Sequence, residues 1–133
     1  NLKMSTNFLK QVGFLNKNIK KDNIKLKTIY ENSDFHVLMT KKEACGVVFS
    51  EANSFGLFNI THNVGGVSGM IKNNVNGIMF KNNTDYKIIA NYIIRLFKNK
   101  KNFLKKSNLS KKYFNNNLDW ISNSKKIQNI LTY

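Results

Sequence analysis

The sequence is short of proline, cysteine, arginine and long apolar runs. Among its 133 residues there is no proline, one cysteine (Cys45) and one arginine (Arg95). A single cysteine excludes both a disulfide framework and a cysteine-built zinc site. No apolar run approaches the roughly 18 residues that a membrane span needs, and no signal-peptide pattern opens the chain. We therefore expect a cytoplasmic location.

Positive charge is what the sequence has in excess. The formal net charge is +15, and all but one of the 22 basic residues are Lys. Together with 23 Asn and no proline, this composition indicates an AT-rich genome. Base-reading and phosphate-clamping sites favour the planar fork of Arg, and the chain has no nucleic-acid-binding motif. We therefore expect no nucleic-acid partner.

The charge is unevenly distributed. Residues 1–42 carry a balance of +6 and residues 81–133 a balance of +10. Residues 43–80 carry −1, from Lys72 against Glu43 and Glu51. A segment that excludes charge yet keeps two carboxylates is where we expect the chemistry.

Strand and helix patterns alternate along the chain. Apolar runs predict strands at 12–15, 35–39, 58–61 and 77–80, and the 35–39 run is typical of a strand buried on both faces. Helical spacing predicts helices at 24–30, 47–55, 67–71, 84–98, 101–116 and 121–131. This order predicts one α/β domain with a Rossmann-like parallel sheet flanked by helices.

The clearest helix is 84–98. Thr84 or Asn83 is the expected cap, and Asp85 suits the dipole of the first turn. The expected core stripe of this helix consists of Ile88, Ile89, Tyr92, Ile93, Leu96 and Phe97.

A candidate ligand site follows the 35–39 strand. Glu43 lies in the loop after this strand, at the end where open α/β sheets bind ligands. Gly46 lets the backbone turn into a helix, and the first amides of that helix, at Gly46, Val47 and Val48, have no intrahelical partner. Such a helix start favours a phosphate.

Glu51 lies eight residues after Glu43, inside the same helix. A carboxylate at this position can accept two hydroxyl hydrogen bonds, each worth about 1.5–3 kcal/mol, from a ribose diol. Two acids around a phosphate-binding helix start indicate a nucleotide-sugar site.

The run E-A-C-G-V-V-F-S-E-A at 43–52 resembles the E-x7-E signature of family 4 retaining glycosyltransferases of GT-B type, usually E-G-F-G-L-x-x-x-E-A. The resemblance runs from about residue 12 to the end of the chain. Five flanking segments agree with the family in the same order: QVGFLN at 11–16, SDFHVLMT at 33–40, VGG at 64–66, NGIMF at 76–80 and LDW at 118–120.

The resemblance implies a role for each matching position. Glu51 would hold the nucleotide ribose, and Glu43 would be the catalytic-site acid that holds the donor sugar near the transferred carbon. Phe14 and Leu15 would line the base pocket. The sugar and the diphosphate would be bound by Glu43 and by the backbone of Ala44, Cys45, Gly46, Val47 and Val48. The family implies no cofactor and no metal in this domain; the nucleotide sugar is a co-substrate.

The chain departs from the family pattern at several places. Cys45 replaces an aromatic residue, Asn16 a glycine, Phe58 a proline and Gly69 a frequent Glu. The family's domain begins with a strand and loop carrying an Arg and a Lys for the diphosphate, and this chain starts after that point. We therefore expect 1–133 to be a single nucleotide-sugar-binding domain, a fragment without its first strand and without the acceptor domain, inactive alone.

The expected partners follow from the resemblance. A UDP-linked sugar is the expected donor, and a lipid-linked or saccharide acceptor would bind through the missing domain, in bacterial surface polysaccharide synthesis. The Lys-rich segment 98–126 is either a solvated face or a surface for anionic lipid on the inner face of the cytoplasmic membrane. The alternative function is a basic, non-catalytic α/β module that binds nucleic acid or a membrane.

Some candidate residues also have a purely structural interpretation. His36 is expected to be a hydrogen-bonded core histidine, whereas His62 is either a structural residue or a ligand near the site. Gly65 and Gly66 form either a simple turn or a donor contact. Cys45 has no paired base and is not expected to be a nucleophile.

Overall fold

The computed structural model describes residues 9–131 and divides the chain into two compact units, residues 1–32 and 33–133. The first unit contains the helix α1, Lys20–Glu31. Asp22 lies in its first turn, and Oδ2 of Asp22 accepts a hydrogen bond from the Asn16 amide at 3.0 Å. The expectation of a single domain over 1–133 stays a prediction.

The strand expected at 12–15 is wrong. Residues 9–16 form neither helix nor strand, and the Phe14 side chain is 91% exposed. Gly13 adopts a φ of 77°, which interrupts the extended backbone that a strand requires. An apolar run makes a strand only where neighbouring strands satisfy its backbone groups.

The second unit is built on a three-stranded parallel sheet in the order β1-β2-β3. The strands are β1 (Phe35–Leu38), β2 (Phe58–His62) and β3 (Gly77–Phe80), with Phe35 opposite Phe58 and Asn59 opposite Gly77. The helices α2 (Val47–Ser54) and α3 (Val67–Met70) connect the strands, as parallel pairing requires a crossover. The predicted α/β class with a parallel sheet flanked by helices is confirmed.

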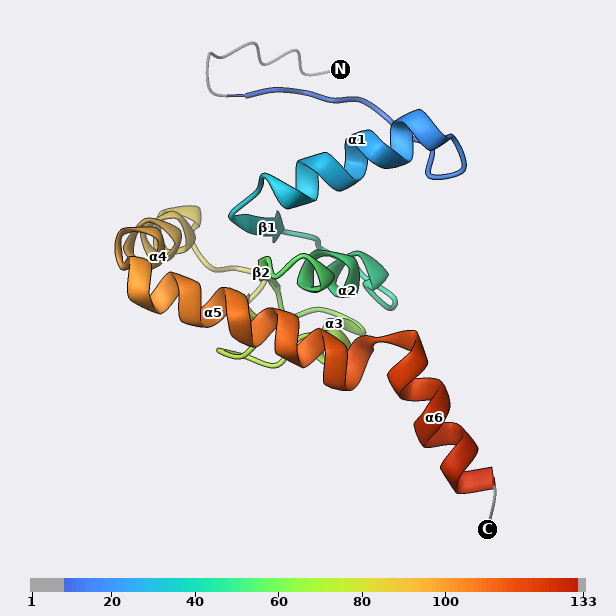
Figure 1. Ribbon diagram of the computed structural model, residues 1–133. Helices are drawn as coiled ribbons and strands as arrows, with labels where there is room; N and C mark the ends of the chain where they lie inside the picture. Colours follow the sequence, from blue (N-terminus) through green and yellow to red (C-terminus); the bar gives the residue numbers. More distant parts are fainter. Residues whose placement is uncertain (1–8, 132–133) are drawn as a thin grey trace. The chain divides into compact units, whose positions relative to one another are not determined.

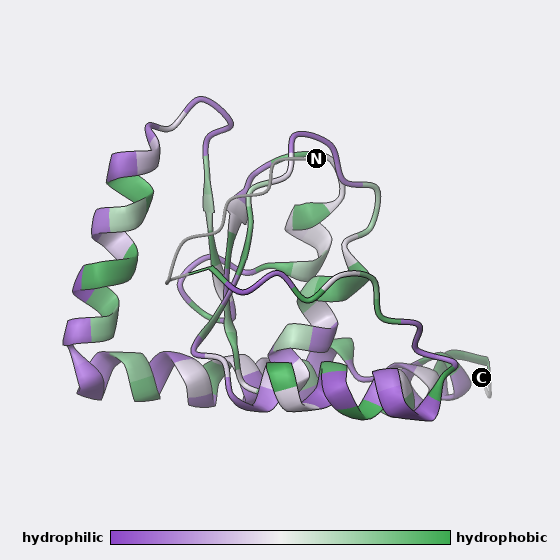
Figure 2. Ribbon diagram, turned by 90° about the horizontal axis from the view of Figure 1, so that it is seen from above, coloured by the Kyte–Doolittle hydropathy of each residue, from purple (hydrophilic) through white to green (hydrophobic). Residues whose placement is uncertain are grey.

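Three long helices follow the sheet. They are α4 (Tyr86–Lys98), α5 (Lys100–Tyr113) and α6 (Trp120–Leu131), with a short π-helix, Phe114–Leu118, between α5 and α6. Figure 1 shows α5 and α6 as consecutive helices with a bend between them. In Figure 2 the strands lie between α4 on one side and α2 on the other.

The core has one cluster on each face of the sheet because successive strand residues point to opposite faces. On the α4 face, Phe58 and Ile60 pack with Ile89 and Leu96. On the other face the buried cluster is Phe49 of α2 with Val67 and Ile71.

Three details differ from the sequence-based expectations. β1 is not buried on both faces, since Val37 is 47% exposed. The cap of α4 is Asp85, whose Oδ1 accepts from the Lys87 amide at 2.7 Å, rather than Thr84 or Asn83. The expected α4 stripe is divided: Ile89 and Leu96 are buried, Tyr92 and Ile93 partly buried, Ile88 and Phe97 exposed.

Candidate functional site

The loops that follow β1 and β2 touch at the carboxyl edge of the sheet. The Gly66 amide donates to the Glu43 carbonyl at 3.0 Å. A Cβ on Gly65 would lie 2.0 Å from the Glu43 carbonyl oxygen, and a Cβ on Gly66 would lie 2.0 Å from that of Ala44. Only residues without a side chain allow the two loops to approach this closely. Gly65 and Gly66 therefore have a structural role in supporting the loop that carries Glu43.

Two further hydrogen bonds hold the same edge together. Thr61 Oγ1 donates to the Leu38 carbonyl at 2.7 Å, and His62 Nδ1 lies 3.1 Å from the Thr40 carbonyl. Because a carbonyl only accepts, Nδ1 of His62 carries the hydrogen in this bond. His62 thus ties the start of the Glu43 loop to the end of β2.

Glu43 is bonded to the helix start that follows it. Its Oε1 accepts a hydrogen bond from the Gly46 amide at 3.0 Å, which fixes the orientation of the half-buried carboxylate. Gly46 is the residue before α2 and adopts the left-handed conformation, with φ of 72°. A Cβ there would also lie 2.5 Å from a ring carbon of Phe49, so glycine is required for two reasons.

The first turn of α2 presents its amides at this edge. The Gly46 amide is used by Glu43, while the amides of Val47 and Val48 have no acceptor inside the helix. Ala44, Cys45 and Val47 are exposed, and Val48 is half-buried. The positive end of the helix dipole and these two amides are suited to an anion.

Glu51 lies one turn further along α2 and is half-buried. It is close enough to His36 of β1 for its charge to raise the pKa of that imidazole. Burial has the larger effect, so the pKa of His36 is below its ordinary value of 6.5. His36 is hydrogen-bonded to Asn59, as expected of a core histidine, and is neutral at pH 7.

The structure brings most of the expected site residues into one loop and helix start. They are Glu43, Ala44, Cys45, Gly46, Val47, Val48 and Glu51. Phe14 and Leu15 belong to the first unit, in its irregular segment. Sequence reasoning missed Asn59, a fully buried amide next to this segment; an Asn in the middle of an apolar strand was the available signal.

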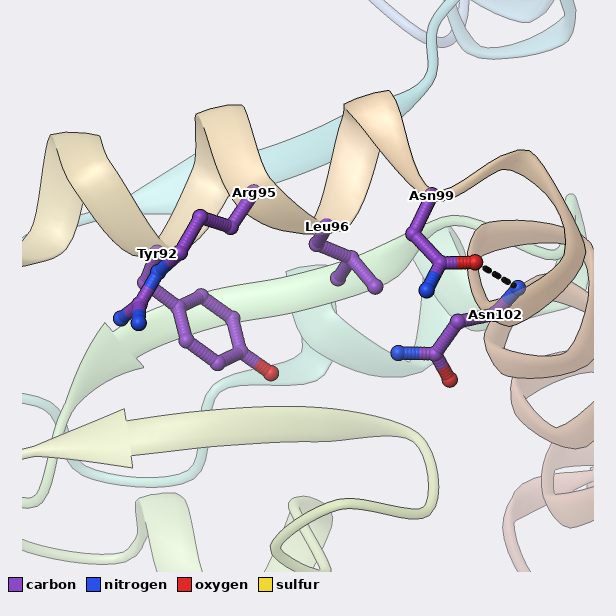
Figure 3. Close-up of a pocket in the computed structure, with 5 residues that line it drawn as sticks. All are labelled: Tyr92, Arg95, Leu96, Asn99 and Asn102. Atoms are coloured by element: carbon purple, nitrogen blue, oxygen red, sulfur yellow. Dashed lines mark hydrogen bonds between the residues drawn. The ribbon is translucent and has the colours of Figure 1, made fainter.

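A separate groove of about 360 Å³ lies at the junction of α4 and α5 and is lined by Tyr92, Arg95, Leu96, Asn99 and Asn102 (Figure 3). Asn99 Oδ1 accepts from the Asn102 amide at 3.0 Å and caps α5. Burial raises the pKa of Tyr92 above its ordinary range. None of the expected site residues lines this groove.

Among residues 9–131, no three His, Cys, Asp or Glu side chains gather closely enough to hold a metal ion. In the same part of the chain, no helix has the length and apolar character to cross a membrane.

Known proteins share both the sequence pattern and the fold. The sequence profile "Glycosyl transferases group 1" matches residues 3–127. No protein of curated function matches the sequence.

Solved structures that share the fold include two of the same protein, HepE. The crystal structure of HepE from Anabaena in complex with UDP aligns with a TM-score of 0.67 and 18% identity over 78% of this chain and 29% of that chain. The complex of HepE with UDP-glucose gives a TM-score of 0.65 and 17% identity over the same shares. The chain thus spans less than a third of the length of HepE. Because the profile covers nearly all of its residues, the chain belongs to the group 1 glycosyltransferase family.

Proposed function

We propose that this chain binds the donor of a retaining glycosyltransferase, a UDP-linked sugar, at the start of α2. The observation that carries the proposal is the arrangement on one loop and helix of Glu43, Glu51 and the amides of Val47 and Val48, which have no acceptor inside the helix. Family membership supports it, and so does the likeness in fold to HepE, which was solved with UDP and with UDP-glucose.

Each group has a role in this proposal. The amides of Val47 and Val48 bind the diphosphate, since the Gly46 amide is occupied by Glu43. Within residues 9–131, Glu43 Oε2 has no hydrogen-bond partner, and it accepts from hydroxyls of the donor sugar. The exposed backbone at Ala44 and Cys45 completes the sugar contacts.

The nucleoside is held by other groups. Glu51 accepts from the two ribose hydroxyls. A diol bound by a charged acceptor gives two bonds of about 1.5–3 kcal/mol each, which makes Glu51 the main determinant of nucleotide affinity.

The chemistry expected of this arrangement is electrostatic. As the sugar leaves, negative charge develops on the departing diphosphate, and the fixed amides and dipole of α2 stabilise it without reorganising. Glu43 lies at the sugar, where positive charge develops, and acts there as a carboxylate. The proposal includes no covalent nucleophile.

The wider setting is part of the same proposal. The Lys- and Asn-rich composition supports a bacterial gene for surface polysaccharide, with a lipid-linked or saccharide acceptor. The lysines of α5 and α6 support a position at the inner face of the cytoplasmic membrane.

Nucleotide titrations test the proposal. UDP-glucose, GDP-glucose and ADP-glucose are titrated into the wild-type chain and into Glu51→Gln, with binding followed by NMR shifts so that weak affinities are measurable. We expect a preference for UDP-glucose and a loss of about tenfold or more in Glu51→Gln, since tenfold corresponds to about 1.4 kcal/mol.

A matched control removes the same charge elsewhere. Glu31→Gln on α1 loses only a solvent-exposed pair with Lys27 at 3.8 Å, which contributes little. It should bind UDP-glucose as the wild type does. Equal affinities of wild type and Glu51→Gln, or salt-sensitive binding of oligonucleotides without nucleotide-sugar binding, would contradict the proposal.

A further inference from the structure

A chain of polar side chains runs through the α2 face of the sheet. His36 and Asn59 are directly opposite each other in β1 and β2, and His36 Nδ1 lies 2.7 Å from Asn59 Oδ1. The Asn59 amide nitrogen lies 3.0 Å from the Phe49 carbonyl and 3.4 Å from the Asn76 carbonyl. Asn59 is fully buried, so each of these bonds replaces one to water that burial removed.

The direction of these bonds follows from their partners. Two carbonyls face one end of the Asn59 amide, so that end is the NH₂ group and the opposite end is the acceptor oxygen. Nδ1 of His36 therefore donates to Asn59. The hydrogen on Nδ1 leaves Nε2 as the position that takes up a proton when the imidazole becomes charged.

This polar chain ends on the first turn of α2. Phe49 is the third residue of the helix and is fully buried, with its ring edge-on to His36 at 5.6 Å between centroids. The same ring lies beneath Gly46, at the loop that carries Glu43. The carbonyl that Asn59 holds thus belongs to the turn that presents the amides of Val47 and Val48.

The far end of α2 has its own anchor. Asn53 is fully buried, its Oδ1 accepts from Asn76 Nδ2 at 2.8 Å, and its Nδ2 donates to the Leu57 carbonyl at 2.9 Å. The helix is therefore attached twice, by Asn59 of β2 near its start and, near its end, by Asn53 to the residues that directly precede β2 and β3. The second attachment provides a control for the first.

We propose that His36 and Asn59 are positioning residues for the nucleotide site, which set the first turn of α2 and Glu51 in place without touching the nucleotide. The inference rests on the proposed function of this site. Its physical reason is the steep dependence of hydrogen bonds on distance and angle: amides and a carboxylate displaced by about 1 Å lose much of their interaction with a bound ligand.

A matched pair of substitutions isolates the hydrogen bond. His36→Phe keeps an aromatic ring against Phe49 but cannot donate to Asn59. His36→Asn loses the ring but places an amide nitrogen where Nδ1 was. We expect His36→Phe to weaken UDP-glucose binding about tenfold or more and His36→Asn to recover most of the affinity.

Asn59→Leu and Asn76→Leu test the two anchors of α2. Both remove a buried amide at similar volume, and both are expected to lower the free energy of unfolding. Only Asn59→Leu should weaken UDP-glucose binding by the folded protein, about tenfold or more, because only Asn59 holds the first turn. Unfolding in urea, measured on each variant, separates stability from affinity.

The pH profile of binding is a readout that a merely structural role would not change. Glu51 on α2 is the charged group that acts on His36, and Asn59 on β2 is its hydrogen-bond partner. As the pH falls below the lowered pKa of His36, the charged imidazole attracts the Glu51 carboxylate away from the ribose, so wild-type affinity for UDP-glucose should fall. The diphosphate of UDP-glucose does not titrate there, and His36→Asn should give a flat profile.

The outcomes separate this inference from the proposed function. If Glu51→Gln binds UDP-glucose as the wild type does, the proposed function is wrong and the inference falls with it. If Glu51→Gln loses binding while folded Asn59→Leu keeps wild-type affinity, the positioning role is wrong and the proposed function stands. Should Asn59→Leu not fold, the His36 pair decides: equal affinities in His36→Phe and wild type overturn the inference.

Discussion

The two faces of the sheet are built from the same three strands but carry different chemistry. On the α4 face, alternate residues of β2 are Phe58 and Ile60, and they pack with the apolar side chains of Ile89 and Leu96. On the α2 face, the residues between them are Asn59 and Thr61, both buried and both hydrogen-bonded. Apolar contacts on the first face stabilise the fold but are non-directional, so they do not specify how the packed elements are oriented. Hydrogen bonds on the second face require aligned partners and therefore fix the orientation of α2 on the sheet.

The largest effect on stability is expected when an aromatic ring is removed from the α4 face. Phe58→Ala should lower the free energy of unfolding by about 3–5 kcal/mol, because the ring is fully buried and leaves a cavity. The folded fraction should bind UDP-glucose with unchanged affinity, measured by titration with urea melts for stability. Reduced affinity in the folded fraction would show that the two faces are not separable.

A glycine substitution at the site edge tests the other face. Gly66→Ala places a Cβ 2.0 Å from the Ala44 carbonyl oxygen, so the Glu43 loop must move, at a cost of about 1–3 kcal/mol. We expect weaker nucleotide binding as well as lower stability. The control is Gly69→Ala, since a Cβ at Gly69 meets no atom within 4 Å; if it weakens binding equally, the contact between the loops is not the cause.

A smaller effect is expected from the cap of α4. Asp85→Ala removes the side chain that accepts from the Lys87 amide and should cost about 0.5–2 kcal/mol in thermal or urea unfolding, with no effect on nucleotide binding. Thr84→Ala should cost clearly less, because Thr84 is not the cap. A larger loss in Thr84→Ala would place the helix start earlier than Asp85.

The smallest expected effects are changes in stability with pH, which differ between the two faces of the sheet. The pKa of His36 is lowered by burial, so the unfolded chain binds more protons just below pH 6.5, and stability should fall as the pH drops below that value. Burial raises the pKa of Tyr92 on the α4 face, so stability should fall as the pH rises above about 10.

Urea melts across pH distinguish the two groups. His36→Asn should remove only the dependence near pH 6, and Tyr92→Phe only the alkaline one. A His36→Asn variant that keeps the full acid dependence would assign that dependence to the carboxylates instead.

The sequence predicted the regular elements of the second unit and the location of its candidate site. Apolar runs and Gly46 were sufficient because strands, crossover helices and a left-handed turn are local consequences of residue type. The strand expected at 12–15 failed because pairing is a property of neighbours, which a run of apolar residues does not specify.

Contacts between distant segments could not be predicted either. Nothing local to Gly65 and Gly66 indicates that the carbonyls of Glu43 and Ala44 press against them. Asn59 is similar: its amide is explained only by Phe49, His36 and Asn76, which the fold brings together. The position of the site can be predicted from one segment, but the groups that hold it come from β1, β2 and the residue before β3.

Cys45 allows a fluorescent probe to be attached next to the proposed site. It is the only cysteine of the sequence, it is exposed, and it lies two residues after Glu43 and two before Val47. A thiol-reactive fluorophore would therefore attach at one position, with no background cysteine to remove. Because the loop on either side is clamped to the sheet, a change in that probe's emission on adding UDP-glucose would report the arrival of ligand rather than the motion of a free loop.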